Sequence, residues 1–204
     1  MSTVLDTASL GPRERYQLLT SLVVPRPIAW VSTRSAAGAA NLAPFSYYAA
    51  ISATPFLVGV SIGHRPHGPK DSLRNILETR AFCINVATEA QMAEMNATSG
   101  EYGPEVDEFA LAGVPLAEAE AVAAPYVATC PAVLECRLFK DVELEGSPNT
   151  LVIGEVVRVR LSGTLLMVDE SRFVSTESLR PLARLWGDLY STIGDTPALA
   201  RPKV

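Results

Sequence analysis

The stretch that decides the fold is RPIAWVSTRSAAGAANLAPFSYY, at residues 26–48. Its first part, PIAWVST at 27–33, is rich in apolar, β-branched and aromatic residues, which is typical of a buried strand. The small residues SAAGAA at 35–40 predict a turn. The chain then returns as a second strand at 41–49, and a third strand is predicted at 56–62. Because the turn is so short, we expect the first two strands to lie side by side.

The remainder of the chain alternates short helices with further strands. The clearest helix signal is KDSLRNILETR at 70–80, where apolar residues fall at i, i+3 and i+4 and form one stripe. Asp71 and Ser72 stand at its start, where capping residues belong. The other expected elements are a loop at 63–69, a strand at 81–87, a short helix at 88–96 and a loop-rich segment at 98–130.

Two long strands, 133–145 and 151–161, are predicted to form a hairpin around the turn GSPN. In the first strand the even positions are apolar and the odd positions, such as Glu135, are polar, so the even face should be buried. In the second strand the odd positions, Leu151 among them, are apolar and are expected inside. Neighbouring strands with few helices predict a mainly β protein, an antiparallel barrel whose closure removes the sheet edges.

The charge balance argues against nucleic acid as a partner. The chain has 22 acidic and 17 basic residues, a formal net charge of −5, and nucleic-acid binding needs a basic face. Residues 35–63 contain no charged side chain and are long enough to span a bilayer. Pro44 and Pro55 interrupt this run, so we expect buried strands and no membrane association.

The cysteines and histidines support neither disulfides nor a metal site. Three cysteines at unequal spacings fit buried, reduced thiols in a cytoplasmic protein. The two histidines, His64 and His67, have no further ligand nearby, so no metal is expected. The first residues lack the pattern of a signal peptide.

The chain also lacks the phosphate-loop, zinc-protease and dinucleotide-binding patterns, and it is poor in histidine. Such a protein usually delegates its chemistry to a cofactor. Its polar groups gather in two places, residues 26–48 and the helix start at 70–75. Free amides, a Lys ammonium and a Ser hydroxyl at a helix start favour an anion site. The alternative is an ordinary capped surface helix.

These two segments together carry a resemblance. The string PRPIAWVSTRSAAGAANLAPFSYY, followed by KDSLRNI, resembles the flavin reductase-like family of FMN-binding split barrels, which includes the flavoredoxins. The resemblance runs from about residue 19 to 161, and a weaker similarity to the same family is found in PLARLWGDLYSTI at 181–193. It implies one domain over 1–204, a split barrel with a few peripheral helices. The core would span about 19–165, with a tail, 166–204, that packs on the core or on a dimer partner.

The resemblance also implies a flavin site at a homodimer interface. Residues 29–33 would contact the isoalloxazine ring, and residues 41–46 would follow the ribityl chain, with Ser46 near the phosphate. Lys70 and Ser72 would hold the phosphate, while Asp71 and Arg74 order that corner. The full set of implied cofactor-binding residues is Ala29, Trp30, Val31, Ser32, Thr33, Asn41, Ala43, Pro44, Phe45, Ser46, Lys70, Asp71, Ser72 and Arg74.

The leading functional hypothesis is an NAD(P)H-dependent flavin reductase that passes a hydride from nicotinamide to flavin N5. The alternatives are a flavoredoxin-like electron carrier with permanently bound FMN, an oxidoreductase of an organic substrate with residues 98–130 as a lid, and a structural or haem-handling split barrel. FMN is expected rather than FAD, because no Gly-rich cradle for a pyrophosphate is present. The sequence does not tell whether NADH or NADPH is the reductant. A homodimer and a redox or monooxygenase protein partner are further expectations.

Overall fold

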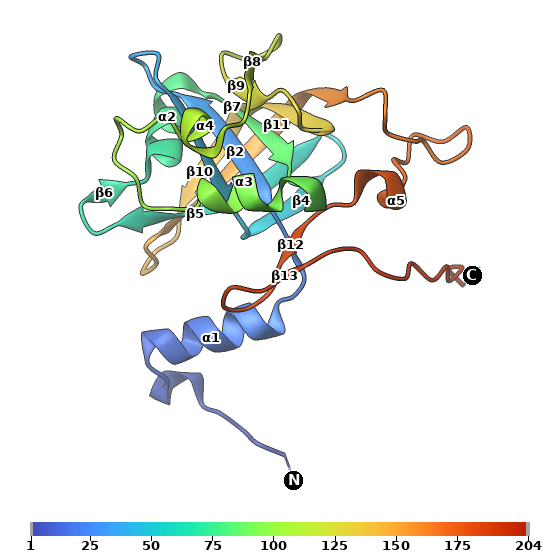
Figure 1. Ribbon diagram of the computed structural model, residues 1–204. Coiled ribbons are helices and arrows are strands. Elements are labelled where there is room, and N and C mark those ends of the chain that lie inside the picture. The colour runs from blue at the N-terminus through green and yellow to red at the C-terminus, as the bar shows by residue number, and fades with distance from the viewer. Residues whose placement is uncertain (1, 203–204) are drawn as a thin grey trace.

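The stretch that decides the fold forms two neighbouring strands, as predicted. In the computed structural model, which describes residues 2–202, β2 (Ala29–Arg34) pairs antiparallel with β3 (Ala40–Phe45) (Figure 1). Gly38 in the turn has a φ of 92°, a conformation that glycine adopts readily. The strand expected at 41–49 is wrong in its extent. It breaks after Phe45, and β4 (Tyr48–Ser52) belongs to the opposite end of the sheet.

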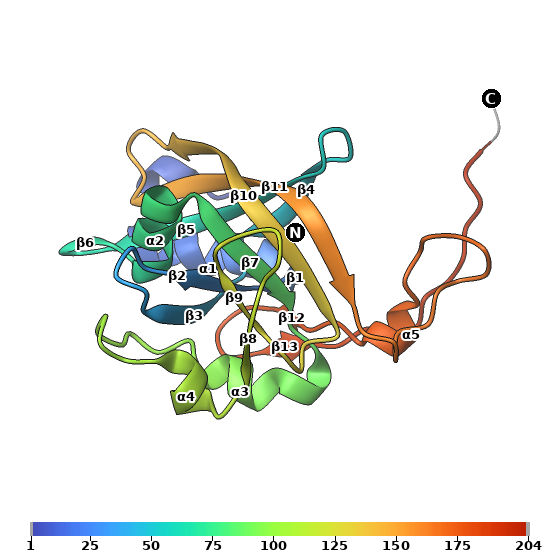
Figure 2. The same cartoon turned by 90° about the horizontal axis from the view of Figure 1, so that it is seen from above.

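The main sheet runs in the order β3-β2-β7-β10-β11-β5-β4, with every neighbouring pair antiparallel and β6 attached to β5. It coils into a barrel (Figure 2). The hydrogen-bonded order ends at β3 on one side and β4 on the other, so the barrel is split and the closure predicted from the strand pattern is not formed. The strands not yet bounded are β5 (Leu57–Arg65), β6 (Gly68–Pro69), β7 (Ala81–Val86), β10 (Ala132–Glu143) and β11 (Asn149–Leu161).

Helices and short strands surround the barrel. The predicted helix at 70–80 is confirmed as α2 (Asp71–Thr79), but neither Asp71 nor Ser72 caps it, because it begins after Lys70 and has no side-chain cap. The predicted loop at 63–69 is largely a hairpin of β5 and β6. The remaining helices are α1 (Pro12–Leu22), α3 (Met92–Ala97), α4 (Glu108–Ala112) and α5 (Thr176–Leu179), with 3₁₀ turns at Thr7–Ser9 and Glu89–Gln91.

Two apolar cores lie on opposite faces of the sheet. One core fills the barrel and includes Val31, Phe82 and Val152, with Leu73 and Ile76 of α2 as its cover. The other core lies outside the barrel, between the sheet and the segment that carries α3, α4 and the hairpin of β8 (Leu116–Glu118) and β9 (Pro125–Val127). Because β2 and β7 contribute to both cores, these strands are covered on both faces.

The predicted faces of the long hairpin are partly wrong. Glu135, expected in solvent, has an exposed fraction of 0%. In β11 the even positions Val152 and Val156 point into the barrel, whereas Val159 and Leu161 are 45% and 41% exposed. The β10–β11 ladder shifts register after Glu135 and again between residues 138 and 140. Such irregularities change which positions face the core, which simple alternation cannot predict.

The last part of the chain returns to the barrel before it leaves again. β12 (Ala183–Arg184) pairs with β1 (Arg26–Pro27) and with β13 (Tyr190–Ser191). An irregular hairpin between β11 and α5 projects from the body, and so does the segment that follows β13, up to residue 202 (Figures 1 and 2). Within residues 2–202, no helix has the length and apolar character that crossing a membrane requires.

Candidate functional site

A groove runs along the free edge of β3. Two cavities, of about 290 Å³ and about 40 Å³, adjoin there and share Pro44, Phe45 and Ser99. β3 is the last strand of the sheet order, so in the part of the chain that the structure describes its outer edge has no neighbouring strand. Pro44 has no N–H to present at this edge. The N–H of Leu42 donates to Oε2 of Glu108 at 3.2 Å. The groove therefore runs beside an unpaired strand edge.

The narrow cavity ends in a polar corner made by Asn41, Lys70 and Ser72. Nδ2 of Asn41 donates to Oγ of Ser72 at 2.9 Å, and both side chains are buried. Within residues 2–202 the Ser72 hydroxyl has no acceptor for its own hydrogen, and Lys70 pairs with no carboxylate. The Lys70 ammonium lies 5.9 Å from the centre of the Phe45 ring. The corner thus holds a hydroxyl donor and a cation that are available to a ligand.

Asp71 joins two arginines behind this corner. Nη1 of Arg65 lies 2.8 Å from Oδ2 of Asp71, and Arg74 binds the other carboxylate oxygen. One carboxylate between two guanidinium groups leaves a net positive charge. Nη2 of Arg65 also donates to the carbonyl of Tyr102 at 2.9 Å. Arg65 therefore ties the start of α2 to the loop after α3, whose residues Ser99, Gly100 and Glu101 line the cavity.

The wider cavity lies at the other end of the groove, where the C-terminal strands reach α3. Tyr190 donates its hydroxyl hydrogen to Oδ1 of Asn96 at 2.8 Å. The guanidinium of Arg184 lies 4.5 Å from the centre of the Tyr190 ring and 3.6 Å from the carboxylate of Asp188. Ser46 lines this cavity from the end of β3. The wall of this cavity therefore comes from segments far apart in the sequence.

Residues 29–33, expected against the ring, are fully buried and do not line either cavity. Three of their side chains make hydrogen bonds inside the protein. Trp30 donates from Nε1 to Oγ1 of Thr98 at 2.8 Å, Ser32 donates to a carbonyl at 2.6 Å, and Thr33 accepts from an amide at 3.0 Å. The backbone of β2 is paired with β3 and β7. This segment builds the wall behind β3 and holds the loop at Thr98.

The structure brings together most of the other predicted positions. Asn41, Ala43, Pro44, Phe45, Lys70, Asp71 and Ser72 line the narrow cavity. Arg74 stands behind it on Asp71. Ser46, expected near the phosphate, lies instead in the wider cavity with Tyr190, because the chain turns away from β3 after Phe45.

Several groove residues carry no local signal in the sequence. Arg65, Thr98 and Glu108 reach the narrow cavity from β5, from the end of α3 and from α4. Burial raises the pKa of the Glu108 carboxyl, the hydrogen bond from Leu42 opposes this, and Asp71 adds to the rise. Only the tertiary fold places these side chains beside Lys70.

One sequence pattern suggests a different chemistry and is excluded by its position. Gly59-Val60-Ser61-Ile62-Gly63 matches the GxSxG pattern of hydrolases. That pattern needs a sharp turn between a strand and a helix, but this one lies within strand β5. Ser61 accepts a hydrogen bond from Asn149 at 3.1 Å and has no adjacent histidine base in its hydrogen-bond partners. Ser61 is therefore a strand residue and not a nucleophile.

Comparison with known proteins agrees with this geometry. Residues 21–177 match the flavin reductase like domain, and the chain therefore belongs to that family. An uncharacterized protein of Halalkalibacterium halodurans is 37% identical to it, over 98% of this chain and 97% of the relative.

Two solved structures are similar over nearly the whole chain. Nitrilotriacetate monooxygenase component B from Bacillus cereus is 30% identical, with a TM-score of 0.91 and coverage of 98% of this chain and 99% of that one. The 2-nitrobenzoate 2-nitroreductase from Pseudomonas fluorescens is 27% identical, with a TM-score of 0.88 and coverage of 98% and 96%.

Proposed function

We propose that the protein binds FMN in the groove along β3 and acts as an NAD(P)H-dependent flavin oxidoreductase. The observation that carries the proposal is the corner of Asn41, Lys70 and Ser72 at the closed end of the groove. It holds a cation without a carboxylate partner and a hydroxyl donor without an acceptor among the described residues. A phosphate monoester supplies the negative charge and the acceptor oxygens that this donor set lacks.

The start of α2 adds to this fit. The helix has nine residues and no side-chain cap, so the amides of its first turn have no side-chain acceptor. The positive end of the helix dipole favours an anion at the same place. Asp71 is neutralised by Arg65 and Arg74, so its carboxylate does not cancel the charge of Lys70. We assign the phosphate of FMN to this corner.

The ribityl chain and the ring would follow β3 toward the wider cavity. Among the described residues no strand pairs with the outer edge of β3, and its backbone groups other than the Leu42 amide, which Glu108 binds, can bind hydroxyls. Ser46, Asn96 and Tyr190 give the wider cavity polar groups beside the apolar surfaces of Ile28, Pro44 and Met95. When bound, the flavin supplies the redox chemistry by accepting a hydride from a reduced nicotinamide. The chain itself binds, orients and limits the access of water.

The proposal does not need an acid or base on the protein, because the flavin supplies the redox chemistry. Purified protein tests it directly. We expect visible flavin absorption, release of FMN rather than FAD by acid, and loss of the absorption when NADH or NADPH is added without oxygen. Protein that is colourless and does not bind added FMN would contradict the proposal.

The second candidate is a flavoredoxin-like carrier that keeps FMN bound and exchanges electrons with a protein. The narrow cavity favours it. Arg65 donates to the carbonyl of Tyr102 at 2.9 Å and so holds the loop whose residues 99–101 line this cavity, which would slow the exchange of FMN. The similarity to a monooxygenase component supports a protein partner in either case. FMN that survives prolonged dialysis and is not reduced by NADH or NADPH would favour the carrier.

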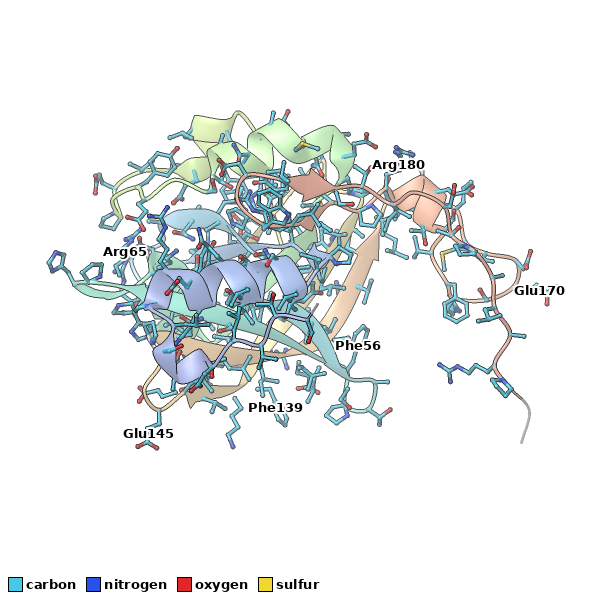
Figure 3. All side chains as sticks on the ribbon, turned by 90° about the horizontal axis from the view of Figure 1, so that it is seen from below. Phe56, Arg65, Phe139, Glu145, Glu170 and Arg180 are labelled. Atoms are coloured by element: carbon cyan, nitrogen blue, oxygen red, sulfur yellow. The ribbon has the colours of Figure 1, made fainter. Side chains whose placement is uncertain are left out.

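We also propose a homodimer. α1 lies across the outer face of the barrel (Figure 3), but only Thr20 of its residues is buried. An apolar cavity of about 300 Å³ lies between α1 and the strands β4, β5 and β11, and its lining includes Leu19, Ile51 and Leu151. Leu19 is 50% exposed. Within residues 2–202 nothing else covers this face, and a second copy would bury it.

Light scattering tests the dimer, with an expected mass of twice 21.8 kDa. Leu19→Glu should shift the equilibrium toward the monomer. Leu199→Glu is the control, because Leu199 is an exposed leucine of the C-terminal extension. A stable monomer in the presence of FMN, or equal effects of the two variants, would contradict this interface.

Three buried, free cysteines fit a reducing compartment, and we propose that the protein is located in the cytoplasm.

A further inference from the structure

Glu108 is a buried acid inside the corner that we assign to a phosphate. It is 7% exposed and lines the same narrow cavity as Lys70 and Ser72. Its carboxylate accepts a hydrogen bond from the backbone amide of Leu42 at 3.2 Å, and the backbone amide of Glu108 itself also favours the charged form. Within residues 2–202 it makes no ion pair. A carboxylate in this position is unusual, because it would oppose the anion that the rest of the corner attracts.

The charged residues that line the cavity with Glu108, or that act on its pKa, come from several elements. Lys70 and Asp71 come from the start of α2, Arg65 from β5, Glu101 from the loop after α3, and Asp107 precedes Glu108 on its own element. β3 carries no charged residue, and the single charge on α3, Glu94, is not part of the cavity lining. Arg65 already forms an ion pair with Asp71, with Nη1 of Arg65 2.8 Å from Oδ2 of Asp71. Among the described residues that line this cavity, Lys70 is therefore the cation that is not already paired with a carboxylate.

We propose that Glu108 takes up one proton when a phosphate dianion enters the corner, so that Glu108 sets the total charge which the corner accepts. This inference rests on the proposed flavin function and deepens it. The proton comes from solvent and binds Oε1, since Oε2 accepts from the Leu42 amide. No bond between heavy atoms forms or breaks. The protonated carboxyl becomes a donor, which suits a phosphate oxygen, and binding of the phosphate is coupled to pH.

The burial of Glu108 already points in this direction. Burial raises the pKa of the Glu108 carboxyl, the Leu42 hydrogen bond lowers it, and Asp71 raises it again. A second negative charge from the ligand raises the pKa of Glu108 further. The protonated fraction thus increases on binding, and affinity for the phosphate decreases as pH rises. The uptake of one proton limits this decrease to about tenfold for each pH unit.

The test compares FMN with riboflavin, which lacks the phosphate, by titration calorimetry between pH 7.5 and 8.5. FMN is a dianion in this range, because the second pKa of a phosphate monoester is about 6. For the wild type we expect proton uptake with FMN, seen as a heat that depends on the buffer, and none with riboflavin. The FMN affinity should fall as the pH rises, by between about twofold and tenfold per pH unit.

Glu108→Gln is the informative variant, because its amide oxygen can still accept from Leu42 while the titrating group is lost. We expect it to bind FMN about tenfold more tightly at pH 8, without proton uptake, and to bind riboflavin as the wild type does. Glu94→Gln is the matched control, because Glu94 on α3 does not line the cavity, and it should keep the proton uptake.

The outcomes separate the two proposals. If wild type binds FMN more tightly than riboflavin but takes up no proton, or if Glu108→Gln keeps the uptake, the role of Glu108 is wrong and the flavin function stands. If neither flavin binds the wild type, the proposed function fails and this inference with it. The wild-type calorimetry decides the question even if Glu108→Gln does not fold.

Discussion

Replacement of Lys70 by alanine is the most direct test of the phosphate corner. Lys70 is half-buried at the start of α2 and lies over the Phe45 ring at 5.9 Å. If its ammonium binds the FMN phosphate, Lys70→Ala removes a charge-assisted hydrogen bond worth about 1.5–3 kcal/mol. This loss corresponds to a decrease in FMN affinity of about 10- to 150-fold. Riboflavin has no phosphate, so its affinity should change little.

The fold should tolerate the change. Lys70 makes no ion pair within residues 2–202, and the cation–π contact with Phe45 is worth about 0.5–1 kcal/mol at an exposed site. Loss of a positive charge at a helix start also removes an unfavourable interaction with the helix dipole. The free energy of unfolding, measured in urea, should therefore fall by less than about 1 kcal/mol.

Fluorescence titration with both flavins gives the affinities, because flavin fluorescence changes on binding. Lys140→Ala is the matched control, since Lys140 lies exposed on β10 away from the groove. It should leave both affinities unchanged. Equal weakening of FMN and riboflavin by Lys70→Ala would show that Lys70 is not the phosphate ligand. No weakening of either would mean that α2 is an ordinary surface helix.

Three further predictions concern the scaffold around the groove. Trp30→Phe removes the indole donor that holds Thr98 at 2.8 Å, and urea unfolding should show a loss of about 0.5–1.5 kcal/mol, with FMN affinity reduced in parallel. Gly154→Ala would place a methyl group 2.4 Å from the Phe82 ring in the barrel, so it should lower the free energy of unfolding by about 1–3 kcal/mol, whereas Gly163→Ala, with open space, should not. Burial raises the pKa of all three thiols, so at pH 8 a thiol reagent should label them only after unfolding, and labelling of the native protein would refute their burial.

Local sequence patterns were sufficient for much of the fold. The hairpin of β2 and β3 and the helix α2 follow from apolar periodicity and turn residues, and both are present. The break after Phe45 could not be predicted, because the segment stays apolar while the chain crosses from one end of the split sheet to the other. The burial of Glu135 depends on a register shift and on the loop that covers it, and neither has a local signal.

The candidate site, like the fold, could be predicted from the sequence only in part. Lys70 and Ser72 belong to a helix start whose residue types indicate an anion site, Asn41 belongs to the other polar segment, and the structure places the three together. Residues 29–33 were expected in the groove, but they are buried in a strand that is paired on both sides, and they do not line either cavity. Arg65 and Glu108 come from elements without a local sequence signal, so only the tertiary fold shows that they line the narrow cavity.

The free edge of β3 has a consequence for how the protein behaves at high concentration. An open strand edge normally invites another strand to pair with it, which is a route to aggregation. Here Pro44 offers no donor, and Glu108 occupies the amide of Leu42. A second polypeptide strand would find the donors it needs missing or already bound. A small molecule needs only a few scattered contacts and is not excluded in this way. The same two residues thus keep the edge open to a ligand and closed to another chain.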